Sequence, residues 1–227
     1  MAKSIFVTAT GTDIGKTYVS GLIVKKMREF GLNCGYYKPV LSGAENINGE
    51  LVPGDCKHVV DTAELKIKPL DCLSYCFLDA VSPHLAAERV NTVINPDKIS
   101  SDYQKISKNY DYMLLEGAGG ITCPMSANEK RVYLLWELIK KLEQNVIVVA
   151  DGGLGTINSI LTTVEYIRNK EIKINGIILN NYDKNNFMHR DNLEMVERLT
   201  GIKVIATVAK DDKDLDIKKE DLEEIFE

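Results

Sequence analysis

This sequence of 227 residues lacks several features that mark other classes of protein. No apolar run approaches the ~18 residues of a membrane-spanning helix, and no charged-then-apolar leader precedes the first expected strand. The five cysteines form neither a CxxC pair nor a Cys/His cluster with zinc spacing. The formal charge of −5 argues against a nucleic-acid partner, which usually meets a basic face. We therefore expect a cytoplasmic protein with reduced thiols and with no membrane or nucleic-acid partner.

Histidine-based catalytic sites are also not indicated. His58, His84 and His189 are isolated in the sequence, and no Ser/His/Asp or Cys/His constellation emerges from it. We interpret each of these histidines as a surface or structural residue.

The sequence does contain an alternation of short apolar runs and longer amphipathic stretches, which is the pattern of βαβ units. Strands are expected at residues 4–8, 34–39, 71–75, 112–116, 145–150, 174–179 and 204–208. Helices are expected at residues 16–30, 82–90, 96–108, 131–142, 157–169, 188–199 and 219–226. Several of the strands are apolar at every position, as parallel strands buried on both faces are. The pattern predicts a single α/β domain over residues 1–227, with a doubly wound, mostly parallel sheet of about seven strands and helices on both faces.

A phosphate-binding loop follows the first expected strand. Residues 9–17 read ATGTDIGKT and lead into an apolar helix. Backbone N–H groups of such a loop face phosphates, Lys16 can reach the β/γ oxygens, and the Thr17 hydroxyl can ligate magnesium. The strict motif has a glycine where this chain has Thr10, and a longer variant has it where this chain has Ala9. Alanine fits there if the backbone is not left-handed.

Charged residues recur where other strands end, at the sheet edge that binds ligands in this class of fold. Glu116 closes an apolar strand and precedes a glycine-rich segment, a position where phosphate-loop enzymes hold magnesium. Lys38 follows the second strand, and a second lysine beside a phosphate suits a site that holds more negative charge than ATP alone. Taken separately, Lys38 is also typical of an exposed lysine, Asp55 of a turn, and Glu116 of a helix cap.

Together these segments resemble dethiobiotin synthetases. The resemblance rests on residues 11–17 (GTDIGKT), 37–43 (YKPVLSG), Asp55, 82–84 (SPH), 116–120 (EGAGG) and 155–158 (GTIN). It implies a P-loop NTPase-like fold and an ATP-dependent ligase that uses Mg²⁺. The implied substrates are 7,8-diaminononanoate, CO₂ or bicarbonate, and ATP, and the product forms through a carbamate and a carbamic-phosphoric anhydride. Two lysines and a metal ion would offset the repulsion between carbamate and triphosphate.

The resemblance also implies roles for individual residues. Catalytic roles fall to Lys38, Lys16 and Thr12, and magnesium ligation to Thr17, Asp55 and Glu116. Substrate binding falls to Ser42, Thr12, Gly155, Thr156 and Asn158, the last three at a helix start. Nucleotide binding falls to Asp13, Ile14, Gly15, Lys16, Thr17, Tyr18, Asp55, Glu116, Gly117, Ala118, Gly119, Asn180, Asn181, Val208, Ala209 and Lys210. A homodimer is expected, with the substrate near the subunit boundary.

Two positions depart from the family pattern. Asp13 stands where many relatives have glutamate, and residues 208–210 lack the usual proline, which bears on nucleotide selectivity. Two rival functions fit the sequence less well. A cobyrinate-type C–N ligase would normally carry a glutaminase domain, for which 227 residues leave no room. A partitioning or carrier ATPase switch commonly has an extra lysine early in the loop, and residues 9–13 contain none.

Overall fold

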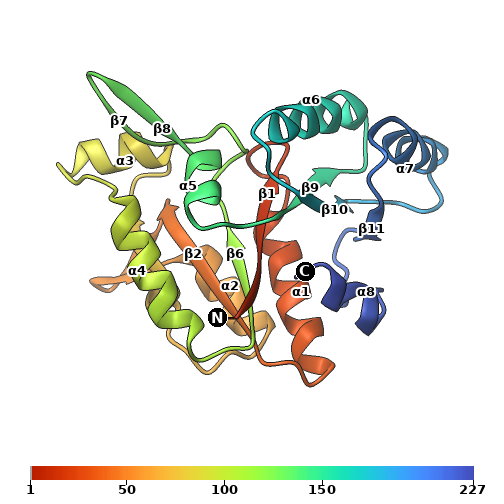
Figure 1. Ribbon diagram of the computed structural model, residues 1–227. Helices are drawn as coiled ribbons and strands as arrows, with labels where there is room; N and C mark the ends of the chain where they lie inside the picture. Colours follow the sequence, from red (N-terminus) through yellow and green to blue (C-terminus); the bar gives the residue numbers. More distant parts are fainter. Residues whose placement is uncertain (1) are drawn as a thin grey trace.

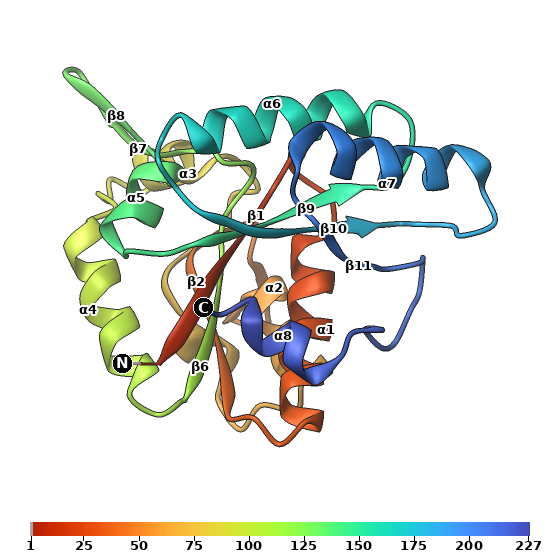
Figure 2. The same ribbon diagram turned by 45° about the vertical axis from the view of Figure 1, so that its right-hand side comes forward.

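The computed structural model describes residues 2–227, and a parallel β-sheet lies at its centre between two layers of helices (Figures 1 and 2). The sheet consists of β1 (Lys3–Ala9), β2 (Cys34–Ser42), β5 (Leu73–Phe77), β6 (Tyr112–Glu116), β9 (Val146–Asp151), β10 (Ile174–Asn180) and β11 (Val204–Thr207). The strand order is β11-β10-β9-β1-β6-β2-β5, and every pairing in the sheet is parallel. The expected doubly wound sheet of seven strands is confirmed.

Two apolar clusters, one on each face, join the helices to the sheet. The helices are α1 (Lys16–Glu29), α2 (Gly54–Thr62), α3 (Pro83–Arg89), α4 (Pro96–Ser107), α5 (Leu135–Lys141), α6 (Thr156–Arg168), α7 (Phe187–Thr200) and α8 (Lys219–Glu224). Side chains of α1, α2 and α8 pack in the cluster on one face, and side chains of α3 to α7 pack in the cluster on the other. The strands are thereby buried on both sides, which is why they are apolar at nearly every position.

Two short hairpins lie outside the main sheet. One pairs β3 (Glu45–Ile47) with β4 (Glu50–Val52), and the other pairs β7 (Pro124–Asn128) with β8 (Arg131–Leu134). The β7–β8 hairpin extends from the body of the molecule near α3 (Figure 1).

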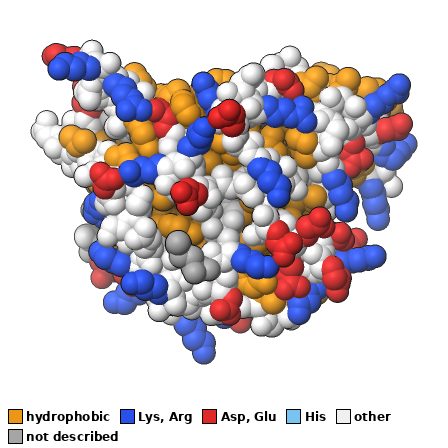
Figure 3. Space-filling model, viewed as in Figure 1, with side chains coloured by type: hydrophobic (Ala, Val, Ile, Leu, Met, Phe, Trp, Pro, Cys, Tyr) orange, Lys and Arg blue, Asp and Glu red, His pale blue; other side chains and the backbone are white. Residues whose placement is uncertain are grey.

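Lys and Arg side chains are interspersed with Asp and Glu side chains over the face in Figure 3. Among the described residues, no helix combines the length and apolar character that crossing a membrane requires.

Several expected boundaries were wrong. Residues 131–134 form a strand instead of the start of a helix, because Asn128 Oδ1 accepts hydrogen bonds from the backbone N–H groups of Lys130 and Arg131 and closes a hairpin turn. The strand expected at 71–75 begins at Leu73, since a 3₁₀ helix from Pro69 to Cys72 precedes it. The last strand ends at Thr207, one residue earlier than expected. The two hairpins and α2 were not expected.

Candidate active site

The loop between β1 and α1 is hydrogen-bonded to the end of β10, which lies two places from β1 in the sheet. Gly15 has a φ of 94°, a left-handed conformation that favours glycine. A Cβ there would lie 2.1 Å from Asn180 Nδ2, and this amide donates a 2.8 Å hydrogen bond to the carbonyl oxygen of Ile14. Ala9 lies in the extended end of β1, so alanine is accommodated at that position. Asn180 therefore fixes the backbone of the phosphate loop.

Lys16 folds back over this loop. Its Nζ donates a 3.1 Å hydrogen bond to the carbonyl oxygen of Gly11, and only 7% of the residue is exposed. Burial lowers the pKa of Lys16, and the nearby charge of Lys38 lowers it further, although Glu116 and Asp55 oppose the change. A cation held by a carbonyl oxygen of this loop is available to phosphate oxygens.

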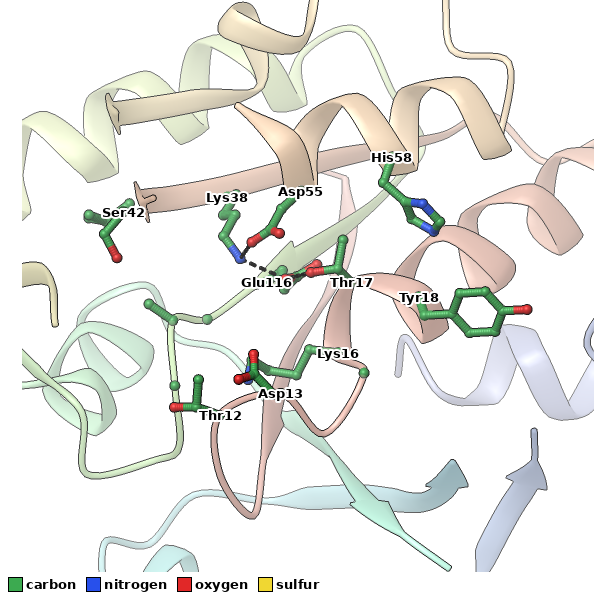
Figure 4. A pocket seen from close by; sticks show the side chains of 15 residues that line it. Thr12, Asp13, Lys16, Thr17, Tyr18, Lys38, Ser42, Asp55, His58 and Glu116 are labelled. Carbon is green, nitrogen blue, oxygen red and sulfur yellow. Dashed lines mark hydrogen bonds and ion pairs between the residues drawn. The ribbon is translucent and has the colours of Figure 1, made fainter. Parts of the chain in front are cut away.

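A cluster of two carboxylates and a lysine lies beside the loop, with Glu116 and Lys38 buried and the Asp55 side chain 43% exposed (Figure 4). Lys38 Nζ lies 2.6 Å from Glu116 Oε1 and 2.7 Å from Asp55 Oδ2. The Thr17 hydroxyl donates a 2.7 Å hydrogen bond to Glu116 Oε1, and the Tyr36 hydroxyl donates a 2.9 Å bond to Oε2. Glu116 is fully buried and Lys38 is 3% exposed. The cluster thus joins β2, β6, α1 and α2 through charge-assisted hydrogen bonds.

The pKa values of this cluster show that its charges stabilise one another. Burial alone would lower the pKa of Lys38, but the charges of Glu116 and Asp55 outweigh it and raise that pKa well above 10.5. Burial alone would raise the pKa of Asp55, but Lys38 outweighs it and lowers that pKa below 3.8. Burial and the charge of Glu116 raise the pKa of Tyr36, so its hydroxyl remains a donor. Lys38 therefore stays protonated and Asp55 stays ionised at neutral pH.

The loop and the cluster line one cavity at the carboxyl ends of β1, β2 and β6. Its lining residues are Thr12, Asp13, Gly15, Lys16, Thr17, Tyr18, Lys38, Val40, Ser42, Asp55, His58, Glu116, Gly117, Ala118 and Gly119. Most residues to which the sequence assigned a role are thus brought together. Val40 and His58 were not assigned to the site, although Val40 follows Lys38 by two positions on β2. His58 lies one turn after Asp55 on α2, with its ring centroid 5.8 Å from that of Tyr18.

Comparison with known proteins places the chain in a family. A family model described as "AAA domain" matches residues 3–215. The ATP-dependent dethiobiotin synthetase BioD of Clostridium botulinum (strain Alaska E43 / Type E3) is 48% identical over 227 residues, which cover all of this chain and 99% of the relative. The protein of the same name from Clostridium perfringens (strain 13 / Type A) is 45% identical over 227 residues, covering all of this chain and 98% of the relative. This chain belongs to the dethiobiotin synthetase family.

Solved structures with low sequence identity share the fold. The ParA family ATPase from Chlorobium tepidum TLS is 14% identical with a TM-score of 0.53, covering 92% of this chain and 85% of that one. The MinC:MinD cell division protein complex of Aquifex aeolicus gives 15% identity and a TM-score of 0.57, covering 93% of this chain and 83% of that one. At this level of identity the likeness establishes the P-loop fold of the family and nothing about its chemistry.

The oxygen donors that the dethiobiotin synthetase pattern assigns to magnesium converge in the cavity. Thr17 and Glu116 are hydrogen-bonded, and Asp55 and Glu116 share Lys38 as a partner. A hydroxyl and two carboxylates are the hard donors that Mg²⁺ prefers. The described residues hold no cluster of three or more His, Cys, Asp or Glu side chains suited to a metal. One hydroxyl and two carboxylates leave coordination positions for phosphate oxygens and water, which Mg²⁺ takes in phosphate-loop sites.

Tyr18 connects the cavity to the segment that follows β11. Its hydroxyl donates a hydrogen bond to the carbonyl oxygen of Asp212. The backbone N–H of Ala209 donates a 2.7 Å bond to Asp212 Oδ2, and Val208 N donates a 2.8 Å bond to the carbonyl oxygen of Leu179. Residues 208–210 thus lie beside the end of β10, close to Asn180, although they are not among the cavity's lining residues.

The remaining predicted residues lie apart from this cavity. Gly155 caps α6 in a left-handed conformation with a φ of 89°, and the Thr156 hydroxyl is buried without a partner among the described residues. Asn158 follows in the first turn of the same helix. Asn181 donates its side-chain amide to Asp151 Oδ2 at 2.7 Å, so it is bound to the end of β9 and not to the phosphate loop.

Proposed function

We propose that this chain is an ATP-dependent dethiobiotin synthetase, converting 7,8-diaminononanoate, carbon dioxide and ATP into dethiobiotin, ADP and phosphate. The observation that carries the proposal is the second buried lysine of the cavity, Lys38, whose charge acts on Lys16. To bind a nucleotide alone, the lysine of the phosphate loop is the one lysine required at the phosphates. A second cation is needed where another anion must approach the γ-phosphate. The full-length relatives are named ATP-dependent dethiobiotin synthetases, and in the reaction proposed here that anion is the carbamate of the diamine.

The reaction proceeds in two steps. One amine adds to carbon dioxide and releases a proton to give a carbamate, an oxygen of which attacks the γ-phosphorus of ATP, and the bond from that phosphorus to ADP breaks. The second amine then attacks the carbamoyl carbon of the resulting carbamic-phosphoric anhydride. The C–O bond to phosphate breaks, and the amine proton leaves with the phosphate. A five-membered cyclic urea remains. Catalysis consists of positioning and charge stabilisation, as in phosphoryl transfer generally.

The lysines and two hydroxyls of the cavity hold the reacting groups. Lys16 contacts the β- and γ-phosphate oxygens, and Lys38 lies on the carbamate side, because β2 also presents Ser42 to the cavity. Thr12 and Ser42 donate hydrogen bonds to the carbamate or to the phosphate. Their hydroxyls suit this role because oxyanions accept strong hydrogen bonds from fixed donors.

Thr17, Asp55 and Glu116 would hold Mg²⁺. When bound, the ion supplies positive charge to the β- and γ-phosphate oxygens. Lys38 lies between the two carboxylates, so it favours the ionised form of Asp55 and holds the two carboxylates close together. The same ion pairs hold Lys38 in the cavity when no nucleotide is present.

The remaining contacts concern the ends of the substrates. Asn180, Asn181 and residues 208–210 contribute to the nucleotide-base side, where Asn180 already supports the phosphate loop. Backbone N–H groups at Gly155 and Asn158, with the hydroxyl of Thr156, bind the distant carboxylate of the diamine, since a helix N-terminus attracts anions. In a homodimer this helix start serves the neighbouring subunit's cavity. We place the enzyme in the cytoplasm.

The test is whether ATP turnover requires the diamine. Purified protein with magnesium, ATP and bicarbonate should release phosphate only when 7,8-diaminononanoate is added, and dethiobiotin should appear in equal amount by mass spectrometry. A nucleotide switch would instead hydrolyse ATP without the diamine and would respond to a protein partner. Diamine-independent phosphate release with no dethiobiotin would overturn the proposal.

A further inference from the structure

Two neighbouring tyrosines on β2 have opposite surroundings. Tyr36 pairs in register with Leu114 of β6 and Tyr37 with Leu115, and successive side chains of a strand point to opposite faces. Tyr36 therefore shares a face with Lys38, two residues further along, and packs in the cluster with α1 and α2. Tyr37 packs in the cluster on the other face, where α4 lies. Both are buried, with exposures of 1% and 0%.

The Tyr36 hydroxyl donates the hydrogen bond that Glu116 Oε2 accepts. Glu116 Oε1 accepts from Thr17 at 2.7 Å and from Lys38 at 2.6 Å, and Oε2 accepts from Tyr36 at 2.9 Å. Among the described residues, no other side chain is hydrogen-bonded to Oε2. A carboxylate held at one oxygen can turn about its terminal torsion, whereas bonds at both oxygens fix its plane. Because Glu116 is fully buried, a missing partner is costly to replace.

We propose that Tyr36 is a positioning residue that fixes the plane of the Glu116 carboxylate, so that Oε1 keeps Thr17 and Lys38 in the arrangement that receives magnesium and nucleotide. This inference rests on the proposed function for its reaction, but not for its test. Groups that orient metal ligands in this way typically change metal affinity or activity by about 10–100-fold when they are removed.

Tyr37 offers a matched control. Its hydroxyl bonds to Ser74 Oγ at 2.6 Å and to the carbonyl oxygen of Ile99 at 3.2 Å, away from the cavity. Tyr36→Phe and Tyr37→Phe each remove one buried hydroxyl from the same strand and keep the ring. Loss of folding stability is therefore expected in both variants, whereas an effect on the site is expected only in the first.

The test measures binding by calorimetry. ATP affinity is determined with magnesium and with EDTA, and the ratio of the two gives the enhancement by metal. Tyr36→Phe should lower this enhancement about 10-fold or more while leaving the affinity in EDTA within about twofold. Tyr37→Phe should leave both unchanged. Equal enhancement in the two variants, or none in the unmodified protein, would overturn the inference.

A double-mutant comparison tests the route of action. If Tyr36 acts through Glu116, adding Tyr36→Phe to Glu116→Gln should cause no further loss of the magnesium enhancement. A further tenfold loss in the double variant would show that Tyr36 acts elsewhere. Failure of the proposed function has a different signature: magnesium-dependent ATP binding would be intact, and its dependence on Tyr36 retained, but no dethiobiotin would form.

Discussion

Replacing Lys38 by methionine removes the cation between Asp55 and Glu116. Lys38 Nζ lies 2.6 Å from Glu116 Oε1, and the two side chains are 4% and 0% exposed. Methionine retains much of the lysine's apolar volume but leaves Glu116 buried without its counter-charge. The Lys38→Met variant should therefore fold less stably, apart from any effect on chemistry.

The size of this effect follows from the geometry. Two unit charges 2.6 Å apart attract by about 6 kcal/mol at an effective dielectric constant of about 20. Desolvation of both groups opposes this attraction, and breaking a buried pair by removing one partner costs about 3–5 kcal/mol. A protein of this kind has a total stability of about 5–15 kcal/mol, so the loss should be large but compatible with folding.

The assay is urea unfolding without nucleotide, with Lys38→Met/Glu116→Gln as the control. Removing both charges should recover more than half of the lost free energy of unfolding, because the buried unpaired anion is then absent. If Lys38→Met unfolds at the same urea concentration as the unmodified protein, the pair makes no net contribution. If the double variant is less stable than Lys38→Met, the loss has another cause, and the reasoning is refuted.

The same variant has a predicted pH dependence. In the folded protein Lys38 lowers the pKa of Asp55 below 3.8, so the stability from this ionisation is present above the unfolded pKa and is lost as pH falls through the folded one. Without Lys38 this contribution disappears. The stability difference between the unmodified protein and Lys38→Met should therefore be largest near neutral pH and shrink below about pH 4. A constant difference from neutral to acid pH would contradict this assignment.

Two further predictions concern the phosphate loop and the strand beside it. Burial and Lys38 lower the pKa of Lys16, so ATP affinity should fall as pH rises in the alkaline range. Lys16→Arg should weaken this fall because arginine stays charged. Equal pH profiles of ATP affinity for the variant and the unmodified protein would contradict the prediction. In Gly117→Ala the new Cβ would lie 2.8 Å from Leu135 Cδ2 and 2.9 Å from Phe6 Cε1, so the variant should lose about 1–3 kcal/mol in urea unfolding. Gly54→Ala, whose Cβ would meet nothing within 4 Å, is the control and should lose nothing.

The strands of the main sheet were predictable because their burial on both faces leaves a continuous apolar run. Where boundaries were wrong, local and non-local signals conflicted. Residues 131–142 carry apolar positions that suit a helix, but the first four are recruited into the hairpin by the Asn128 turn, and Glu137 then accepts from the backbone N–H of Leu134. The helix α2 was missed because its Pro53-Gly54 start reads as a turn.

The candidate site was predictable to the extent that residues at the ends of parallel strands meet. Glu116 ends β6 and follows that rule, whereas Lys38 was expected after the second strand and lies inside β2, which continues to Ser42. Tyr36 was not predicted to belong to the site, because a tyrosine within a strand is normally a core residue. Its hydrogen bond to Glu116 depends on the register of β2 and β6. Asn180 was assigned to the nucleotide base, but its bond to Ile14 depends on the place of β10 in the sheet. The assigned roles, the single domain and the dimer stay predictions.

The most direct test of the proposed function follows the oxygen atoms of bicarbonate. ¹⁸O-labelled bicarbonate, 7,8-diaminononanoate and magnesium-ATP are mixed with enzyme in a single rapid turnover, and both products are analysed by mass spectrometry. The carbamate route predicts one labelled oxygen in the released phosphate and one in the ureido group of dethiobiotin. Phosphate without label, or phosphate released without dethiobiotin, would contradict the account.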